Sequence, residues 1–223
     1  AETNALAKRK KKLVYGAMFQ MRTSRTWAKV KQLVEEGEIG EMKRMSWIVT
    51  SWFRTQSYYD SGGWRATWDG EGGGVLLNQC PHNLDMLCWV CGTPTRVIAQ
   101  VALGKYHKIE VEDDVTAYLE FKNGATGLFV TTTGEAPGTD RFEIAGDRGR
   151  LVVEGGHIDI IKTDVSVSDF CKNSEERFAK PQTSRITVDP GKGGNSHQMI
   201  TENFVNTLLN GEPLVAPATE ERQ

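Results

Sequence analysis

Apolar residues recur with a helical period near the start of the chain. Within residues 24–36 they return every three or four positions. These apolar positions are Trp27, Val30, Leu33 and Val34. Because this spacing places them on one face, it predicts an amphipathic helix over residues 24–36. Before it, we expect a helix over residues 2–12 from their composition and a strand over the apolar run at residues 13–19.

Most of the remaining chain has the pattern of β-strands, with short apolar runs separated by turn residues. A long strand is predicted over residues 42–53. Shorter strands are predicted over residues 96–103, 115–121, 125–132, 141–145, 150–153 and 157–162. Two longer segments, residues 75–91 and 196–210, have helical period and are each followed by glycine. Residues 164–190 are more polar and give no prediction.

The dipeptide Asn123-Gly124 separates two of these strands. Both residues tolerate positive φ, as a two-residue type I′ turn requires. The strand pairs expected from this turn are Phe121 with Thr126, Leu119 with Leu128 and Ala117 with Val130. A second hairpin is predicted at residues 146–149. Together the elements predict an α+β fold, with an open, mainly antiparallel β-sheet and helices on one face.

The predicted helix over residues 75–91 carries a stripe of polar and aromatic residues. Asn78, His82, Asp85 and Trp89 recur at spacings of four, three and four, which places them on one side of a continuous helix. An imidazole can exchange a proton with a reacting hydroxyl near neutral pH, and the Asn78 amide could hydrogen-bond the same hydroxyl. The alternative is a structural helix with one satisfied histidine. Cys88 and Cys91 have C-x-x-C spacing but no second pair, so we interpret them as core residues.

Six aromatic residues crowd the segment before this helix, residues 52–68, which also contains Arg54 and Arg65. Aromatic faces stack on sugar rings, and guanidinium groups bind hydroxyls and carboxylates, so the segment suggests a carbohydrate-like ligand. The alternative is a loop folded over its own aromatic residues. Stacking on nucleobases is disfavoured by the charge of the chain.

Composition narrows the function classes. The 223 residues contain 27 Lys and Arg against 29 Asp and Glu, a formal net charge of -2, which argues against a nucleic-acid partner. No apolar run approaches the roughly 20 residues that a membrane-spanning helix needs, and no signal peptide is recognised. With only four cysteines, we expect a reduced, cytoplasmic protein.

Other ionisable residues give weaker signals. The acidic run Glu110, Glu112, Asp113 and Asp114 could suggest a metal ion, but we interpret it as the solvated start of a strand and expect no metal site. The histidines outside the helix lack partners at ligand spacing, and we expect surface or capping roles for them. These are His107, His157 and His197.

Several motifs resemble those of one family. Residues 72–85, Gly-Gly-Gly-Val-Leu-Leu-Asn-Gln-Cys-Pro-His-Asn-Leu-Asp, resemble the glycine-rich D-x-x-x-H-x-x-D helix of the Gfo/Idh/MocA oxidoreductases. Residues 35–41 are similar to the G-x-I-G-E segment of that family and residues 19–22 to its F-x-x-R. Residues 146–149 are similar to its G-x-x-G hairpin and residues 203–211 to its late helix.

The resemblance implies a fold and an activity. Members join an N-terminal Rossmann domain, which binds NAD or NADP, to a C-terminal α+β domain, and move a hydride between the nicotinamide and a carbon of a sugar, polyol or related alcohol. By resemblance, His82 is the acid/base or substrate-orienting residue, Asn78 stands where aspartate is common, and Arg22 lies near the cofactor. The residues assigned to substrate binding are Arg54, Tyr58, Arg65, Trp68 and Asp85.

The family's G-x-G-x-x-G turn and E-K-P motif are absent from these 223 residues. We therefore expect a fragment, with residues 1–22 a remnant of the dinucleotide-binding domain and residues 23–223 the substrate-binding and oligomerisation domain. Such a fragment is expected to be inactive alone, to bind no NAD or NADP, and to dimerise through its sheet face. The alternatives are a non-catalytic sugar-binding or dimerisation module and a relative of the NAD-dependent glycosidases.

Overall fold

The computed structural model describes residues 13–191 and 193–218. The helix expected over residues 2–12 lies outside these residues. The chain forms two compact units: residues 30–189, and residues 1–29 together with 190–223. The two units are described separately below.

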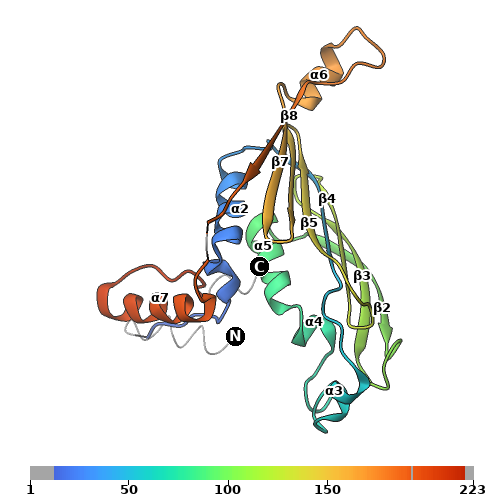
Figure 1. Cartoon of the computed structure of the whole chain (residues 1–223), viewed down its shortest axis with the longest axis vertical. Coiled ribbons are helices and arrows are strands. Elements are labelled where there is room, and N and C mark those ends of the chain that lie inside the picture. The colour runs from blue at the N-terminus through green and yellow to red at the C-terminus, as the bar shows by residue number, and fades with distance from the viewer. Residues whose placement is uncertain (1–12, 192, 219–223) are drawn as a thin grey trace. The chain divides into compact units, whose positions relative to one another are not determined.

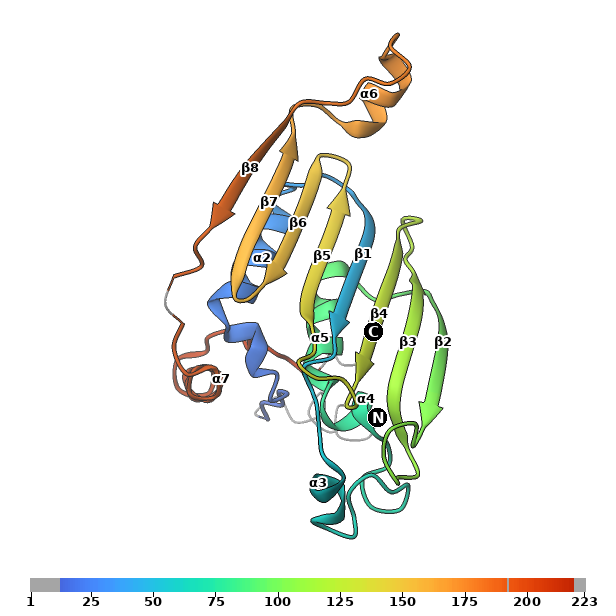
Figure 2. The same cartoon turned by 45° about the vertical axis from the view of Figure 1, so that its right-hand side comes forward.

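The larger unit is built on one eight-stranded sheet with the order β2-β3-β4-β1-β5-β6-β7-β8 (Figure 1 and Figure 2). The strands are β1 (Met42–Val49), β2 (Arg96–Leu103), β3 (Glu112–Glu120), β4 (Thr126–Thr132), β5 (Asp140–Gly146), β6 (Gly149–Glu154), β7 (His157–Thr163) and β8 (Thr183–Val188). β1 and β4 are parallel, and every other neighbouring pair is antiparallel. The expected open, mainly antiparallel sheet is confirmed.

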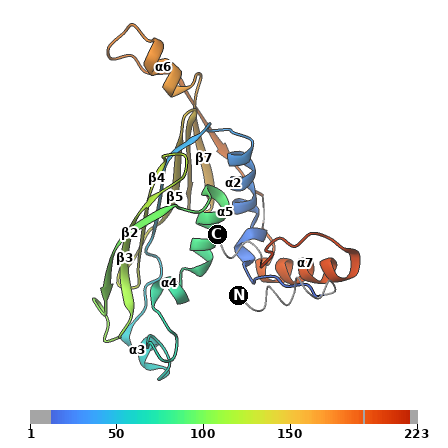
Figure 3. The same cartoon turned by 180° about the vertical axis from the view of Figure 1, so that it is seen from behind.

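The helices α4 (Val75–Asn78) and α5 (Pro81–Cys91) lie on one face of this sheet, as Figure 1 and Figure 3 show. In the central strands such as β1 and β3, alternate residues are buried, as the period of a strand requires, whereas β2 and β8 at the edges have no buried residue. Trp47 on β1 lies at the centre of this face, edge-on to Phe129 at 6.4 Å and to Phe142 at 5.1 Å between ring centroids. The core therefore lies between the helices and the middle of the sheet.

The predicted register of the β3–β4 hairpin is wrong by one residue. Glu120 pairs with Thr126, and the Phe121 N–H donates to the carbonyl of Ala125. The connection is thus a three-residue loop, in which Gly124 alone has positive φ, at 83°. Because a shift of one residue changes which face each side chain occupies, Phe129 is the buried partner in β4, and Leu128 is on the open face.

The continuous helix expected over residues 75–91 is also corrected. It is interrupted between Asn78 and Pro81, and Pro81 is the first residue of α5. Proline has no N–H to donate, and within one continuous helix its ring would clash with the carbonyl of Leu77. Asn78 and His82 therefore belong to two successive helices.

The remaining elements of this unit are α3 (Gln56–Asp60), in the aromatic segment, and α6 (Val167–Asn173). α6 and β8 fall in residues 164–190, where no element was predicted. The expected strand over residues 42–53 is shorter, ending at Val49.

The smaller unit contains the short 3-10 helix η1 (Gln20–Thr23), the start of α2 (Arg25–Glu35), and α7 (Ser196–Asn210). The strand expected over residues 13–19 is not formed: this segment has one isolated bridge, between Gly16 and Pro217. The range predicted for α7 is confirmed, with Asn195 capping its start and Gly211, at φ 73°, ending it. Within the described part of the chain, no helix is both long and apolar enough to cross a membrane.

Candidate functional site

Two arginines and a tyrosine of the aromatic segment lie together. The guanidinium carbon of Arg54 is 5.1 Å from the ring centroid of Tyr58, and that of Arg65 is 4.7 Å from it. Arg65 also donates a hydrogen bond of 3.0 Å to the Tyr58 hydroxyl. All three side chains are partly exposed. The segment therefore presents two cations, ordered by one aromatic ring, to solvent.

Asn78 joins this cluster from the end of α4. The Tyr58 hydroxyl donates to Asn78 Oδ1 at 3.5 Å, and Gln79 Nε2 donates to the same oxygen at 2.7 Å. Asn78 Nδ2 donates to Glu71 Oε1, while Glu71 Oε2 accepts the Ala66 N–H at 2.8 Å. The orientation of the Asn78 amide is thus set from both sides. Sequence reasoning missed Glu71, because nothing in its spacing relates it to Asn78.

The start of α4 is held by a residue of strand β3. Both carboxylate oxygens of Glu112 accept the Gly74 N–H at 3.0 Å, and Oε1 also accepts the Leu76 N–H at 3.1 Å. A β-carbon at Gly74 would lie 1.9 Å from the Glu112 carbonyl oxygen, so this close approach requires glycine. Glu112 is buried, and the prediction that it belongs to a solvated strand start is wrong. A negative side chain at a helix start also satisfies N–H groups that lack intrahelical partners.

His82 and Asp85 lie in the first turns of α5. They are three positions apart, so they share one face of that helix, and both side chains are half-buried. His82 is partly exposed as a residue, but its ring atom Nδ1 is buried. Because the helix is broken before Pro81, the spacing of four between Asn78 and His82 does not place them on one helix face.

Trp68 contributes differently. Its ring is exposed, and its backbone N–H donates to Glu110 Oε2 at 3.2 Å. The ring is therefore available for stacking against a ligand. Its role in substrate binding stays a prediction.

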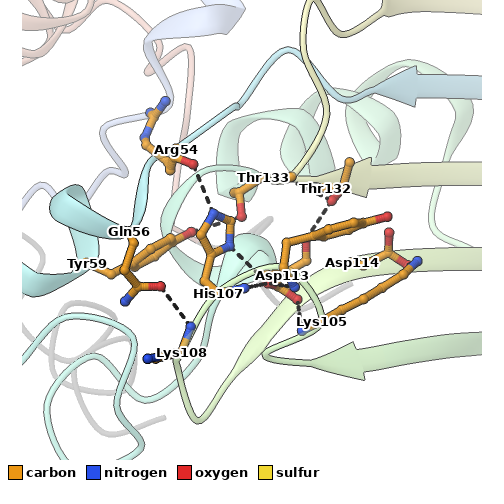
Figure 4. Close-up of polar contacts among 12 residues, drawn as sticks. Arg54, Gln56, Tyr59, Lys105, His107, Lys108, Asp113, Asp114, Thr132 and Thr133 are labelled. Carbon is orange, nitrogen blue, oxygen red and sulfur yellow. Dashed lines mark hydrogen bonds and ion pairs between the residues drawn. The ribbon is translucent and has the colours of Figure 1, made fainter.

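Two further predictions about ionisable residues are wrong. His107, expected at the surface or in a cap, has a side chain only 6% exposed, and the Asp113 side chain beside it is fully buried. Figure 4 shows both in a polar cluster next to Arg54 and Tyr59.

The thiols are not activated. Burial raises the pKa of Cys80 to about 11 and that of Cys91 to about 12. Both groups are therefore protonated at neutral pH, and a protonated thiol is neither a nucleophile nor a good metal ligand. This agrees with the interpretation of the cysteines as packing residues.

Arg22, predicted near the cofactor, belongs to the smaller unit. It is buried, donates to the Val215 carbonyl at 3.3 Å, and lies 5.8 Å from the Phe19 ring centroid. Its predicted role is not tested by these contacts.

A family model matches the part of the chain that carries this cluster. Residues 27–152 match the model of the GFO/IDH/MocA C-terminal domain. The chain belongs to the GFO/IDH/MocA family. The predicted family membership is therefore confirmed. A comparison with curated proteins finds no match.

Solved structures of this family share the fold. The WlbA dehydrogenase from Bordetella pertussis, in complex with NADH and UDP-GlcNAcA, is 28% identical, with a TM-score of 0.70 over 91% of this chain and 54% of that one. The WlbA enzyme from Chromobacterium violaceum, in complex with the same two compounds, is 26% identical, with a TM-score of 0.74 over 96% of this chain and 58% of that one. Levoglucosan dehydrogenase in complex with NADH and L-sorbose, at 20% identity and a TM-score of 0.70, shows the shared fold alone. The chain thus spans 54% and 58% of the two WlbA chains.

Proposed function

We propose that this chain is the substrate-binding part of a cytoplasmic, NAD-dependent oxidoreductase that acts on an alcohol group of an anionic sugar derivative. The observation that carries the proposal is the cluster of Arg54 and Arg65 around the ring of Tyr58, beside Asn78. Guanidinium groups bind carboxylates and phosphates through paired hydrogen bonds. Support for a sugar derivative comes from the two WlbA structures, which contain UDP-GlcNAcA.

Each site residue has a role in this proposal. His82 exchanges the proton of the reacting hydroxyl, and Asn78 hydrogen-bonds the substrate from the neighbouring helix. Arg54 and Arg65 bind the anionic group, next to Tyr58. Trp68 stacks on a ring of the substrate, and Asp85 accepts a hydrogen bond from a hydroxyl.

The residues of this chain do not fit the phosphates of a dinucleotide. The sequence contains no G-x-G-x-x-G turn, the element that lets a backbone approach a pyrophosphate. We therefore expect no tight binding of NAD(H) or NADP(H) by residues 1–223 and no turnover by this chain alone. Calorimetry with NADH and NADPH tests this, and a dissociation constant in the micromolar range or below would contradict it.

The substrate site is tested by titrating UDP-GlcNAcA, with L-sorbose as an uncharged comparison, into the chain while following tryptophan fluorescence. We expect UDP-GlcNAcA to bind and Arg65→Ala to weaken its binding at least tenfold, since a charge-assisted contact is lost. Arg96→Ala is the matched control, because Arg96 is an exposed arginine on β2 that forms an ion pair with Glu120. No response to either sugar, or equal loss in both variants, would contradict the proposed site.

The role of His82 needs a protein in which this chain is joined to a dinucleotide-binding domain. There, His82→Ala is expected to lower kcat/KM by about 10² to 10⁴, the range for a general acid or base. Turnover close to that of the unaltered protein would assign His82 to packing. A sugar that binds with normal affinity but is never oxidised would favour the second candidate, a non-catalytic sugar-binding module, for which the amide at Asn78 is the supporting observation.

A further inference from the structure

His107 lies in the connection between β2 and β3 and bridges two parts of the larger unit. Its Nδ1 is 3.0 Å from Asp113 Oδ2, and its Nε2 is 2.9 Å from the backbone carbonyl oxygen of Arg54 (Figure 4). One ring nitrogen therefore faces β3, and the other faces the segment that carries the arginine cluster.

Both of these partners are acceptors. A carbonyl oxygen can only accept a hydrogen bond, and so can an ionised carboxylate, whereas a neutral imidazole donates from one nitrogen alone. Two simultaneous hydrogen bonds thus require a ring protonated at both nitrogens. The pair is then a buried imidazolium and carboxylate, each with its hydrogen-bonding groups satisfied.

The Asp113 carboxylate is surrounded by donors. It accepts the backbone N–H groups of Lys105 at 2.8 Å, Tyr106 at 2.8 Å and His107 at 3.1 Å, in addition to the His107 ring. Hydrogen bonds from several N–H groups favour the charged form of a carboxylate. The backbone of Asp113 is fixed as well, because its carbonyl accepts from the Thr132 hydroxyl at 2.7 Å. Asp113 is therefore a rigid, negatively charged anchor.

The backbone of Arg54 is held on both sides. Its N–H donates to the Thr133 carbonyl at 2.9 Å, and its carbonyl receives the His107 ring. Next to it, the Tyr59 ring packs 4.8 Å from the His107 ring, and its hydroxyl donates to Thr133 Oγ1 at 2.9 Å. The position of the Arg54 side chain thus depends on a chain of contacts that starts at Asp113.

We propose that His107, as an imidazolium between Asp113 and Arg54, is a positioning residue that holds the arginine and tyrosine segment in the geometry needed for substrate binding. The proposal rests on the proposed function, because it assigns Arg54 and Tyr58 to the substrate site. His107 is buried and acts through Arg54.

No other ionisable group described around the His107 ring is an anion that could pair with it. Tyr59 faces it from α3, and burial raises the pKa of its phenol, so that group is neutral at pH 8 and below. The Arg54 guanidinium is directed toward the Trp52 and Phe53 carbonyls. On its own loop, the Lys105 ammonium pairs with Asp114 at 3.1 Å. Asp113 is thus the anionic partner of the His107 ring.

The protonation state can be measured directly on the unaltered chain, which contains only four histidines. Histidine labelled with ¹⁵N gives different ring signals for an imidazolium and for a neutral tautomer. We expect one histidine with two protected ring N–H groups, assigned to His107 by its loss in His107→Phe. A single neutral tautomer for His107 would overturn the proposal, and this measurement requires no ligand.

The positioning role is tested with His107→Phe, which keeps a ring against Tyr59 but removes both donors. We expect the Arg54 amide to exchange with deuterium at least tenfold faster and UDP-GlcNAcA to bind at least tenfold more weakly. His157→Phe, at an exposed histidine on β7, is the matched control and should change neither. Unchanged exchange and unchanged affinity in His107→Phe would overturn the proposal.

The two proposals fail in different ways. If no sugar derivative binds even to the unaltered chain, the proposed function fails, while the ring signals and the Arg54 exchange still decide whether His107 holds this segment as an imidazolium. If UDP-GlcNAcA binds but the ring of His107 is neutral, the substrate site stands and the positioning role fails.

Should His107→Phe not fold, His107→Gln, which keeps one donor group, replaces it in the exchange measurement. We expect intermediate exchange at the Arg54 amide. Exchange equal to that of the unaltered chain would count against the positioning role.

Discussion

The Asn78 side-chain amide donates from Nδ2 to the Glu71 carboxylate, so the residue that stands in place of the family's common aspartate is itself paired with a carboxylate. Asn78 can act as a donor to Glu71 and an acceptor for Tyr58 at the same time. An aspartate at position 78 would be able to accept only. The site therefore contains a carboxylate, contributed by a residue seven positions earlier in the chain.

This pairing predicts that Asn78→Asp is unfavourable in the presence of Glu71. Two carboxylates within hydrogen-bond distance repel each other, and the pKa of one is raised. Because a raised carboxyl pKa costs stability above that pKa, the variant should have a lower melting temperature at pH 7 and recover as the pH falls toward about 4. Thermal unfolding at both pH values measures this.

The double variant Glu71→Gln with Asn78→Asp restores one donor and one acceptor. We expect it to melt close to the unaltered chain at pH 7. If Asn78→Asp alone is as stable as the original at pH 7, Glu71 does not act on residue 78.

The sequence predicted the elements of the fold better than their junctions. β2 and α7 have the predicted ranges. For α7, the helical period of the apolar residues ends where Gly211 follows, so both signals mark the same end. The Asn123-Gly124 dipeptide, by contrast, fits both a two-residue turn and a three-residue loop, and the β3–β4 register depends on which one forms. Pro81 is a signal for the break between α4 and α5, but the apolar pattern continues through it and therefore favoured one long helix.

The proximity of Arg54 and Tyr58 could be expected from the sequence, because they are four positions apart in one segment. Glu112, Asp113 and His107 were misjudged, because their partners are mainly backbone N–H and carbonyl groups that folding brings to them. Composition does not distinguish such buried acceptors from a solvated acidic run. Only the tertiary fold shows which carboxylates are satisfied by backbone amides.

Gly74→Ala should destabilise the larger unit strongly. The added β-carbon would meet the Glu112 carbonyl oxygen at 1.9 Å, and moving the backbone away also weakens the hydrogen bonds that hold the start of α4. We expect a loss of about 1–3 kcal/mol, the range for overpacking a buried position. Gly63→Ala is the control, since a β-carbon there has no neighbour within 4 Å. The urea midpoint of Gly74→Ala should be lower than that of Gly63→Ala. Equal midpoints would show that the backbone at Glu112 can move away from the added β-carbon without loss of stability.

Asp147 should stabilise the start of α6 in a pH-dependent manner. Hydrogen bonds from Ser166 and Ser168, together with Lys43, hold the pKa of its carboxyl well below its usual value. A lowered pKa means that the carboxylate stabilises the fold at pH values above about 3.9, and that this stabilisation is lost as the pH falls through the folded value. The urea midpoint of Asp147→Asn should therefore lie below that of the unaltered chain at pH 7, and the gap should narrow below pH 4.

Asp164→Asn is the control for that comparison. It also removes one carboxylate, from the residue that directly follows β7. It should show a smaller gap at pH 7. A gap for Asp147→Asn that stays constant from pH 7 to pH 3 would mean that the serine contacts do not depend on its charge.

The sheet face opposite the helices is proposed to form a dimer. Three apolar side chains on β2, β3 and β4 lie side by side there: Ile98 is 48% exposed, Tyr118 41% and Leu128 38%. Adjacent apolar groups on an open sheet are costly in water and suit a self-complementary interface.

Tyr118→Arg places a charge at the middle of this row, so sedimentation of the variant is expected to give a monomer at concentrations where the unaltered chain is a dimer. Phe178→Arg changes an apolar residue that is 92% exposed between α6 and β8, and it should leave the dimer intact. Dissociation by Phe178→Arg and not by Tyr118→Arg would move the interface away from the sheet.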